Sequence, residues 1–506
     1  MAYTTFAAID VGSYEIGMKI FELSKNRGMR EIDSIRHRLE LGREAYTTGK
    51  ISMEKVENLC QLLMSYKTIM EGYQVDDYRA CATSAVREAK NSLILLDYIE
   101  KRTGVHIEVL SNSEQRFLDY KSIASRENEF NKIIQKGTAI IDVGGGSVQF
   151  SLFDKDSLVT TQNIRIGNLR IREKLAGVEK NAAHVENLIE ELVNNDLVSF
   201  KKMYLKEREI TNLVIVGDNI REVARAASIT REEFLQLYEQ IVHYTIDEVT
   251  DRFEVSADHI YMLIPSLIIH RRFIEEFGIE TIWMPGLDLS DGMAYEYAQK
   301  NKIIRAGHNF DEDIIAAARN IAKRYMCSKS HIRALEELAL VIFDKTKKLH
   351  GLDRRKRLLL QIAVILHGCG KYISLSNVAE CSYRIIMATE IIGLSHSERE
   401  VIANVVRFNT QEFDYYESLS THTAVTEEEY LITAKLTAIL RVANALDRSH
   451  KQKFKSAKVL LKEEELLITV DTQEDITLEK SLFPEKAEFF EEVFGIRPVI
   501  RQKKHL

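Results

Sequence analysis

The feature that most constrains the fold is a strand, turn and strand pattern that occurs twice. The first copy contains DVGS at residues 10–13, and the second is AIIDVGGGSVQFSLF at residues 139–153. In each copy an apolar run ends in an aspartate, turns through glycine and serine, and continues as a run of alternating apolar residues, which predicts a β-hairpin. The repetition of this unit predicts two related α/β halves.

The order of helical and strand patterns predicts the domain organisation. Helical stripes such as that at 53–73 alternate with short apolar strands up to about residue 300, which indicates an α/β layered architecture. Successive helical patterns follow without strands, and β alternation returns near 459–470 before a last helix. We therefore expect α/β lobes at 1–124 and 125–303, an all-α domain at 304–452 and a small α+β cap at 453–506.

Composition limits the cellular setting and the partners. Lys and Arg number 69 against 76 Asp and Glu, and no sustained basic block marks a nucleic-acid arm or a membrane-surface helix. Five widely spaced cysteines without a CxxC pair fit a reducing compartment better than a disulfide framework. The sequence shows neither a signal-peptide pattern nor an apolar run of about 18 residues. We expect a cytoplasmic protein that binds neither nucleic acid nor membrane.

The glycine turns suggest a site for an anion. Consecutive glycines expose backbone N–H groups, and a concave row of such donors holds phosphate. Because a carboxylate repels phosphate, Asp10 and Asp142 are interpreted as holding a divalent cation or its waters. The alternative for a single turn is a tight hairpin whose aspartate caps the turn. Two copies that both keep the aspartate favour a phosphate-binding cleft between the lobes.

Taken together, the motifs resemble those of the exopolyphosphatase/guanosine pentaphosphate phosphohydrolase family. Besides both hairpins, the resemblance lies in ATSAVREAKN at 82–91, VLSNSEQRFLDY at 109–120, and FDKTKKLHGL and LRVANALDRSH in the helical domain. It implies two ribonuclease H-like lobes of the actin superfamily, followed by a domain similar to a His-Asp phosphohydrolase module. It also implies hydrolysis of inorganic polyphosphate or guanosine pentaphosphate, Mg²⁺ as cofactor, and a homodimer.

The same resemblance implies roles for individual residues. Asp10 and Asp142 would hold the metal, and Arg87 would bind a phosphate oxygen. The catalytic positions would be Asp142, Gln115, Gln149 and, after a one-residue shift, Glu114. Phosphate would be bound by Gly12, Ser13, Arg87, Gly144, Gly145, Gly146 and Ser147.

The sequence departs from the family at the expected proton acceptors. Glutamates of the family correspond to Gln115 and Gln149, and an amide can orient a water but cannot take its proton, a loss that typically costs ~10²–10⁴-fold in rate. Glu114 would replace Gln115 only if the helix bulged, because neighbouring helical residues point in different directions. Tyr14 and Glu15 add bulk and negative charge beside the first turn.

Two further family elements are incomplete. Where relatives read LHDIG, this chain reads LHGCG, so His367 lacks its aspartate partner, and a histidine run of relatives is replaced at 377–381. We expect a helical domain without metal ligands, since one histidine without carboxylates holds a divalent metal weakly. Only Gly217 remains of a third glycine element, so phosphotransfer of the related kinase type is the weakest hypothesis.

Two hypotheses therefore remain open. In the first, the chain is a weak exopolyphosphatase-like hydrolase that uses Mg²⁺. In the second, it keeps the phosphate cleft but has lost catalysis, and acts as a regulatory protein that binds polyphosphate or an alarmone.

Overall fold

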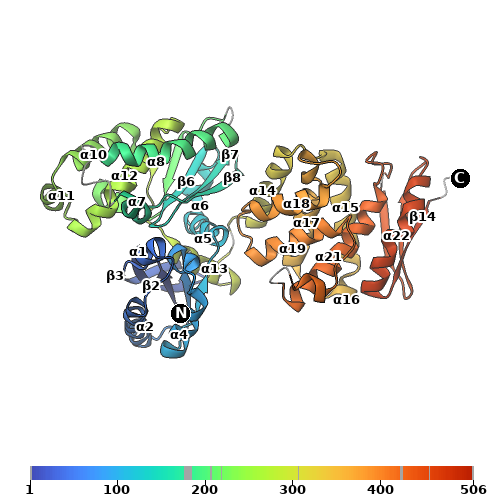
Figure 1. The fold of residues 1–506 in the computed structure, drawn as a ribbon, viewed down its shortest axis with the longest axis horizontal. Helices are drawn as coiled ribbons and strands as arrows, with labels where there is room; N and C mark the ends of the chain where they lie inside the picture. The colour runs from blue at the N-terminus through green and yellow to red at the C-terminus, as the bar shows by residue number, and fades with distance from the viewer. Residues whose placement is uncertain are drawn as a thin grey trace. The chain divides into compact units, whose positions relative to one another are not determined.

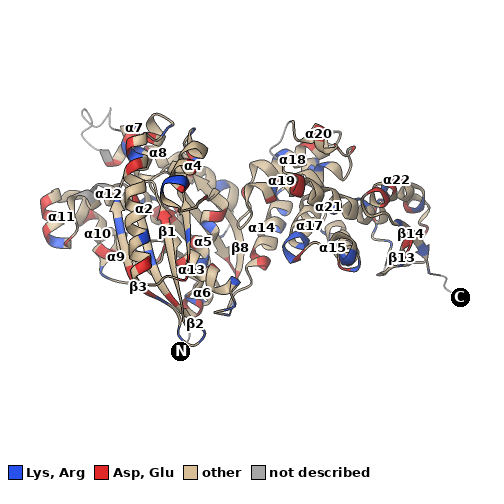
Figure 2. Cartoon of the chain, turned by 90° about the horizontal axis from the view of Figure 1, so that it is seen from below, with Lys and Arg blue, Asp and Glu red and all other residues tan. Residues whose placement is uncertain are grey.

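The computed structural model describes residues 3–175, 185–205, 208–217, 219–305, 307–421, 425–454 and 456–503 (Figure 1). The chain divides into two compact units, Met1–Phe310 and Asp311–Leu506. None of the described helices combines the length and apolar character needed to cross a membrane. Lysines and arginines alternate with acidic residues along the helices of both units (Figure 2).

The first sheet of unit 1 has the strand order β3-β2-β1-β4-β5. Strands β1 to β3 are antiparallel, and β4 and β5 continue from β1 in parallel. Their bounds are β1 Thr4–Val11, β2 Glu15–Ser24, β3 Gly28–Arg38, β4 Asp77–Ala82 and β5 Ile107–Val109. The helices that follow them are α1 Leu41–Thr47, α2 Met53–Gly72, α3 Ser84–Glu88 and α4 Ser92–Thr103. The helical stripe predicted at 53–73 is confirmed on α2, where Val56, Leu59, Leu63 and Tyr66 are buried in the core of this sheet.

The second sheet repeats this topology, with the order β8-β7-β6-β9-β11-β10. Its strands are β6 Thr138–Val143, β7 Val148–Asp154, β8 Ser157–Ile164, β9 Asn212–Ile215, β10 Ser228–Thr230 and β11 Thr281–Trp283. Its helices are α7 Asn168–Leu175, α8 Val185–Phe200, α9 Asn219–Ala224, α10 Arg231–His243, α11 Ile246–Phe253 and α12 Ala257–Phe277, with a π-helical turn at Lys201–Leu205. Both sheets thus begin with an antiparallel meander and continue with a parallel strand, as the duplicated motif predicts.

The chain passes from one sheet to the other through α5 Asn112–Ala124 and α6 Glu127–Ile133, and it returns through α13 Leu289–Lys300. Helix α13 lies within the second lobe predicted at 125–303, yet its Leu289, Met293 and Ala294 share a core with Phe6 and Ala8 of β1. Helix α13 also crosses α5 closely, because a Cβ on Gly292 would lie 2.1 Å from the carbonyl oxygen of Leu118. The first lobe is therefore built from two separate stretches of the chain.

Unit 2 contains a group of helices followed by a small sheet. The helices are α14 Phe310–Arg324, α15 Lys329–Lys345, α16 Lys347–His350, α17 Arg354–Leu366, α18 Val378–Ala388, α19 His396–Phe408, α20 Tyr416–Leu419 and α21 Glu427–Leu446, with a 3₁₀ turn at Cys369–Tyr372. Strands β12 Ser456–Leu461, β13 Glu465–Asp471 and β14 Arg497–Gln502 form the sheet, and α22 Thr477–Phe494 precedes its last strand. The likeness of this unit to a His-Asp module remains a prediction.

Candidate active site

The two hairpin turns line one cavity of about 510 Å³ within unit 1. The first turn contributes Asp10, Gly12 and Ser13 to the wall. The second contributes Asp142, Gly144, Gly145 and Ser147. Other lining residues come from α5, from the segment before α9, and from α12 and α13: Gln115, Asp119, Gly217, Asn219, His259, Met262, Asp288 and Leu289.

The carbonyl groups of the second turn are held by the first turn of α7. Asn168 N donates to Gly144 O at 3.0 Å, and Leu169 N and Arg170 N both donate to Gly145 O at 3.0 Å. Arg170 Nε donates to Gly146 O at 2.9 Å. In a trans peptide the N–H points opposite to the C=O, so the following N–H groups are aimed away from α7. This arrangement orients backbone donors as an anion site requires.

The glycines of the turns permit close approach. Gly12, Gly144, Gly145 and Gly146 all avoid positive φ. A Cβ on Gly146 would lie 2.1 Å from the Tyr46 hydroxyl oxygen and 2.5 Å from Ser84 Oγ, and one on Gly12 would lie 2.6 Å from Glu15 O. Gly146 itself is absent from the cavity lining, so its side of the turn packs against the first lobe.

Arg170, which donates to the second turn, also ties the two lobes together. Within the first lobe, Ser13, Tyr46 and Ser84 form a triangle of hydroxyl groups with oxygen separations of 2.7–2.8 Å, against which Gly146 packs. The Arg170 guanidinium lies 4.1 Å from the centre of the Tyr46 ring and donates to both carboxylate oxygens of Glu88, at 2.9 and 2.8 Å. The turn is therefore fixed from both lobes.

Four aspartates give the cavity a high density of negative charge. Burial, together with Asp288, Glu15 and Asp142, raises the pKa of Asp10 to about 8. Burial raises the pKa of Asp142 to about 6, although a hydrogen bond from Gln115 opposes the shift. Burial and the charges of Asp142, Asp10 and Asp288 raise the pKa of Asp119 well above its usual value. The mutual repulsion means that the cavity favours protons or cations.

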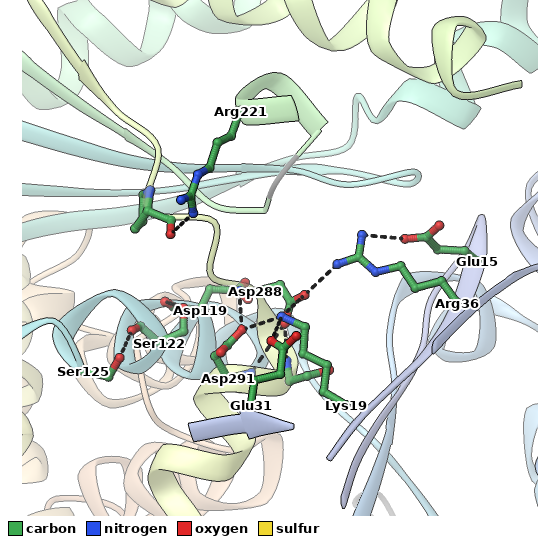
Figure 3. A network of polar contacts seen from close by, with 12 residues as sticks. Glu15, Lys19, Glu31, Arg36, Asp119, Ser122, Ser125, Arg221, Asp288 and Asp291 are labelled. Atoms are coloured by element: carbon green, nitrogen blue, oxygen red, sulfur yellow. Dashed lines mark hydrogen bonds and ion pairs between the residues drawn. The ribbon is translucent and has the colours of Figure 1, made fainter. Parts of the chain in front are cut away.

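Asp288 is the exception in this group, because it has cationic partners. Lys19 Nζ lies 2.9 Å from Asp288 Oδ2 and 2.8 Å from Asp291 Oδ2, and Arg36 lies 3.2 Å from Asp288 Oδ2 (Figure 3). Burial alone would raise the pKa of Asp288, but Lys19 and Arg36 hold it below the usual value. Asp288 also caps α13 by accepting from Asp291 N, which explains its place at this helix start.

The donor set fits a hydrated divalent cation. Oδ1 of Asp10 and Oδ2 of Asp119 are buried without a hydrogen-bond partner in the part of the chain that the structure describes. Within the same residues, no group of three or more His, Cys, Asp or Glu side chains is spaced to hold a metal directly. A cation that keeps several waters and uses one or two carboxylates, as Mg²⁺ does, matches both observations.

Gln115, and not Glu114, faces the cavity. Gln115 Nε2 donates to Asp142 Oδ2 at 3.3 Å. Glu114 is the third residue of α5 and forms a capping box, in which Ser111 N and Ser111 Oγ donate to Glu114 Oε2 at 3.0 and 2.7 Å. Glu114 does not line the cavity, so its position gives no support to the hypothesis that it replaces Gln115.

Gln149 lies beside Asp142, since the two residues are paired across β6 and β7. Its side chain is 1 % exposed, and neither amide atom has a hydrogen-bond partner among the described residues. It is absent from the cavity lining. A buried amide without partners is costly, which indicates that a water or ligand atom belongs next to it.

The phosphate-binding role that the resemblance implies for Arg87 stays a prediction, and the structure shows two groups that its guanidinium contacts. Its guanidinium donates to Leu110 O at 2.6 Å and to Asn112 Oδ1 at 2.5 Å. Arg87 does not line the cavity. In this arrangement it fixes the connection between β5 and α5, and so positions the helix that carries Gln115.

Sequence reasoning missed several residues of the cavity wall. Asp119 follows Gln115 by four residues, a spacing that places both on one helix face and that was available as a signal. Asn168, whose buried Oδ1 lacks a partner among the described residues, starts a short helix without an obvious sequence pattern. Asp288 reaches the site only because α13 packs on the first sheet.

Unit 2 gathers histidines that the sequence treats separately. His367 ends α17 as its C-cap, and its ring lies 5.1 Å from that of His331. His331 Nδ1 lies 2.7 Å from Asp447 Oδ2, and the ring of His450 stacks on His331 at 3.6 Å. His367 thus belongs to a cluster of histidines in which His331 is buried and His367 and His450 are partly buried.

Comparison with known proteins identifies the family. The model of the Ppx/GppA phosphatase family matches residues 20–301, and that of domain III of the same phosphatases matches residues 315–486. The chain belongs to the Ppx/GppA phosphatase family. The first match begins after the first glycine turn, so Asp10, Gly12 and Ser13 lie outside it.

Individual Ppx/GppA relatives are distant. The guanosine-5'-triphosphate,3'-diphosphate pyrophosphatase of Aliivibrio fischeri is 19% identical over 87% of this chain and 86% of its own. The bifunctional 3-dehydroquinate synthase/phosphatase of Fusobacterium nucleatum is 24% identical over 33% of this chain, which spans only 26% of that protein.

Solved structures of Ppx/GppA proteins share the fold. The Aquifex aeolicus family member has a TM-score of 0.50 at 19% identity, and an exopolyphosphatase from Cytophaga hutchinsonii has 0.52 at 18% identity. Each likeness covers 59% of this chain and 99% of the other.

Proposed function

We propose that the chain is a phosphoanhydride hydrolase of the exopolyphosphatase type. It would release terminal phosphate from inorganic polyphosphate or from guanosine pentaphosphate, at a rate far below that of a relative with glutamates at both amide positions. The observation that carries this proposal is the single cavity shared by two Asp-Gly turns, one of which has its carbonyl groups tied back by α7.

A cation is part of the proposal because of the charge balance. Six lining side chains are carboxylates and two are arginines, so a polyanion would be repelled by the bare cavity. Asp10 and Asp142 would hold Mg²⁺, which would neutralise phosphate charge and polarise the terminal phosphoryl group. The backbone amides of Gly145 and Ser147, which line the cavity, would bind phosphate oxygens, and Ser13 would be held in place by Tyr46 and Ser84.

The second hypothesis, a binding protein without catalysis, is favoured by the two amides. Gln115 donates a hydrogen bond to Asp142, Gln149 is the cross-strand partner of Asp142, and an amide at either position cannot accept the proton of water. Such a protein would bind polyphosphate or a guanosine polyphosphate between the lobes and regulate a partner.

Phosphate release with Mg²⁺ separates the two hypotheses. Long-chain polyphosphate and guanosine pentaphosphate are each incubated with wild type, Gln115→Glu and Gln115→Glu/Gln149→Glu. We expect slow release by wild type and faster release by the variants. Fast wild-type release that neither variant improves would contradict the weakened-hydrolase proposal, while Mg²⁺-dependent binding of both compounds without any release would support the regulatory hypothesis.

A further inference from the structure

We propose that Asp119 is the proton acceptor of the hydrolytic reaction, in place of the carboxylates that positions 115 and 149 lack. This inference rests on the proposed hydrolase function and deepens it, because it names the group that takes the proton from water.

Asp119 lies on the cavity side of α5, one helical turn after Gln115. Asp119 follows Gln115 by four residues on α5, so the two side chains lie on the same helix face. Both line the cavity together with Asp142. A carboxylate is therefore present one helical turn away from the amide.

The other carboxylates of the cavity wall form ion pairs or are the proposed cation ligands. Asp288 is paired with Lys19 and Arg36, and Glu15 lies 3.7 Å from Arg36. Glu222 lies 3.3 Å from His259 Nδ1. Asp10 and Asp142 end the strands at the glycine turns and are the proposed cation ligands. Asp119 is the remaining carboxylate of the described cavity wall.

The burial of Asp119 does not stabilise the fold. Its side chain is 4 % exposed, and Oδ2 has no hydrogen-bond partner among the described residues. An unpartnered buried carboxyl oxygen destabilises the folded state. Such a group is typical of a site that acts on a ligand.

The charge of the cavity bears on the protonation of Asp119. Burial and the charges of Asp142, Asp10 and Asp288 raise its pKa, and Arg116 on the same helix opposes this shift. Positive charge held at Asp10 and Asp142 would offset the repulsion from these two carboxylates and favour the ionised form of Asp119, which is the form that accepts a proton.

In the proposed step, the oxygen of a water forms a new bond to the terminal phosphorus while one of its protons passes to Asp119 Oδ2. The bond from phosphorus to the bridging oxygen breaks, and its electron pair leaves with the shortened polyphosphate or guanosine tetraphosphate. Orthophosphate is released, and Asp119 then returns the proton to solvent.

The test compares Asp119→Asn with Asp156→Asn in the full chain. Asparagine keeps the shape of Asp119 but cannot accept the proton, so we expect kcat for polyphosphate hydrolysis to fall ~10²–10⁴-fold while KM and the Mg²⁺ half-saturation change little. Asp156→Asn makes the same change at an exposed turn outside the cavity and is expected to keep wild-type kcat. Wild-type turnover by Asp119→Asn overturns the inference. A loss of kcat in Asp119→Asn that higher Mg²⁺ concentrations reverse also overturns the inference, since such a result would mean that Asp119 is a metal ligand.

Two further measurements distinguish loss of the proton acceptor from a structural effect of the Asp119→Asn substitution. Gln115→Glu added to Asp119→Asn is expected to recover at least about tenfold of the lost kcat, and no recovery would contradict the inference. An infrared difference spectrum of wild type minus Asp119→Asn is expected to show a protonated carboxyl band that persists, without Mg²⁺, above the pH at which an exposed aspartate ionises. Loss of this band at the pH of an exposed aspartate would also contradict it.

The results distinguish this inference from the proposed function. If wild type releases no phosphate from either compound, the hydrolase proposal fails and the inference fails with it. If wild type releases phosphate and Asp119→Asn does so equally well, only the assignment of Asp119 is wrong.

Discussion

Gln115 donates a hydrogen bond from Nε2 to Asp142 Oδ2 over 3.3 Å, and this contact joins α5 to the end of β6. The donated hydrogen bond favours the ionised form of Asp142 and partly offsets the effect of burial on its pKa. The amide therefore supports the charge of Asp142 even though it cannot act as a base.

Exchanging this donor for a carboxylate gives a first prediction. Gln115→Glu places a second negative charge beside Asp142, so we expect lower thermal stability without Mg²⁺ and tighter Mg²⁺ binding. Thermal unfolding and calorimetric Mg²⁺ titration measure the two effects. Gln115→Leu, which removes the hydrogen bond without adding charge, is the control and should not tighten binding.

The acidic cavity predicts how pH and Mg²⁺ act together on unit 1. The pKa of Asp10 is raised to about 8 and that of Asp142 to about 6, so their contribution to stability is present below about pH 4 and is lost as pH rises through these values. We expect Mg²⁺ to raise the unfolding temperature strongly at pH 8 and little at pH 5. Asp10→Asn should reduce this difference between the two pH values. A wild-type shift of the unfolding temperature that is equal at pH 5 and pH 8 would contradict the prediction.

The second glycine turn predicts unequal tolerance of alanine. A Cβ on Gly146 would meet Tyr46 and Ser84, whereas one on Gly144 would have its nearest neighbour, Ser147 O, at 3.5 Å. We expect Gly146→Ala to cost about 1–3 kcal/mol of folding free energy and Gly144→Ala much less. Denaturant unfolding of both variants checks this. Equal losses would show that the close approach at Gly146 relaxes without cost.

Two arginines that share Glu88 offer a matched comparison. The side chain of Arg170 is 16% exposed and also donates to Gly146 O, while that of Arg165, at 3.1 Å from Glu88, is 70% exposed. We expect Arg170→Leu to destabilise unit 1 by about 2 kcal/mol, and Arg165→Leu by less than about 1 kcal/mol. Thermal unfolding gives both values, and the reverse order would contradict the role of Arg170 in holding the turn.

The histidine cluster predicts acid sensitivity of unit 2. Burial and neighbouring His331 lower the pKa of His367 to about 3 and that of His450 to about 4. Neutral histidines in the folded state contribute stability above about pH 6.5 that is lost as pH falls toward these values. We expect the calorimetric transition of unit 2 to move to lower temperature between pH 7 and pH 5. His450→Gln should flatten this dependence, and an unchanged slope would exclude His450 as a source.

Local sequence patterns were sufficient for the duplicated hairpins, because strand alternation and glycine turns are properties of neighbouring residues. They also predicted the buried stripe of α2 and placed Asp10 and Asp142, which line one cavity. They did not predict that α13 packs on the first sheet, because its partners Phe6 and Ala8 lie almost 300 residues earlier in the chain.

Local patterns say least about side chains whose partners are set by tertiary structure. The phosphate-binding role of Arg87 stays a prediction, and its guanidinium donates to the carbonyl of Leu110 in this structure. Glu114 was considered as a base, but the helix start uses it as a cap. The four-residue spacing places Asp119 on the same helix face as Gln115, so the sequence allows its prediction, and the packing of α5 against β6 and β7 turns this face toward the cavity.

The return of α13 to the first sheet has a mechanical consequence for unit 1. The polypeptide passes between the lobes twice, once at 125–137 and again at 284–288, so two connecting segments join the lobes. Two connecting segments permit rotation of the lobes about the line between the segments and resist rotation about other axes. Opening of the cavity would then follow one axis, and a protease that cleaves one segment would leave the lobes attached by the other.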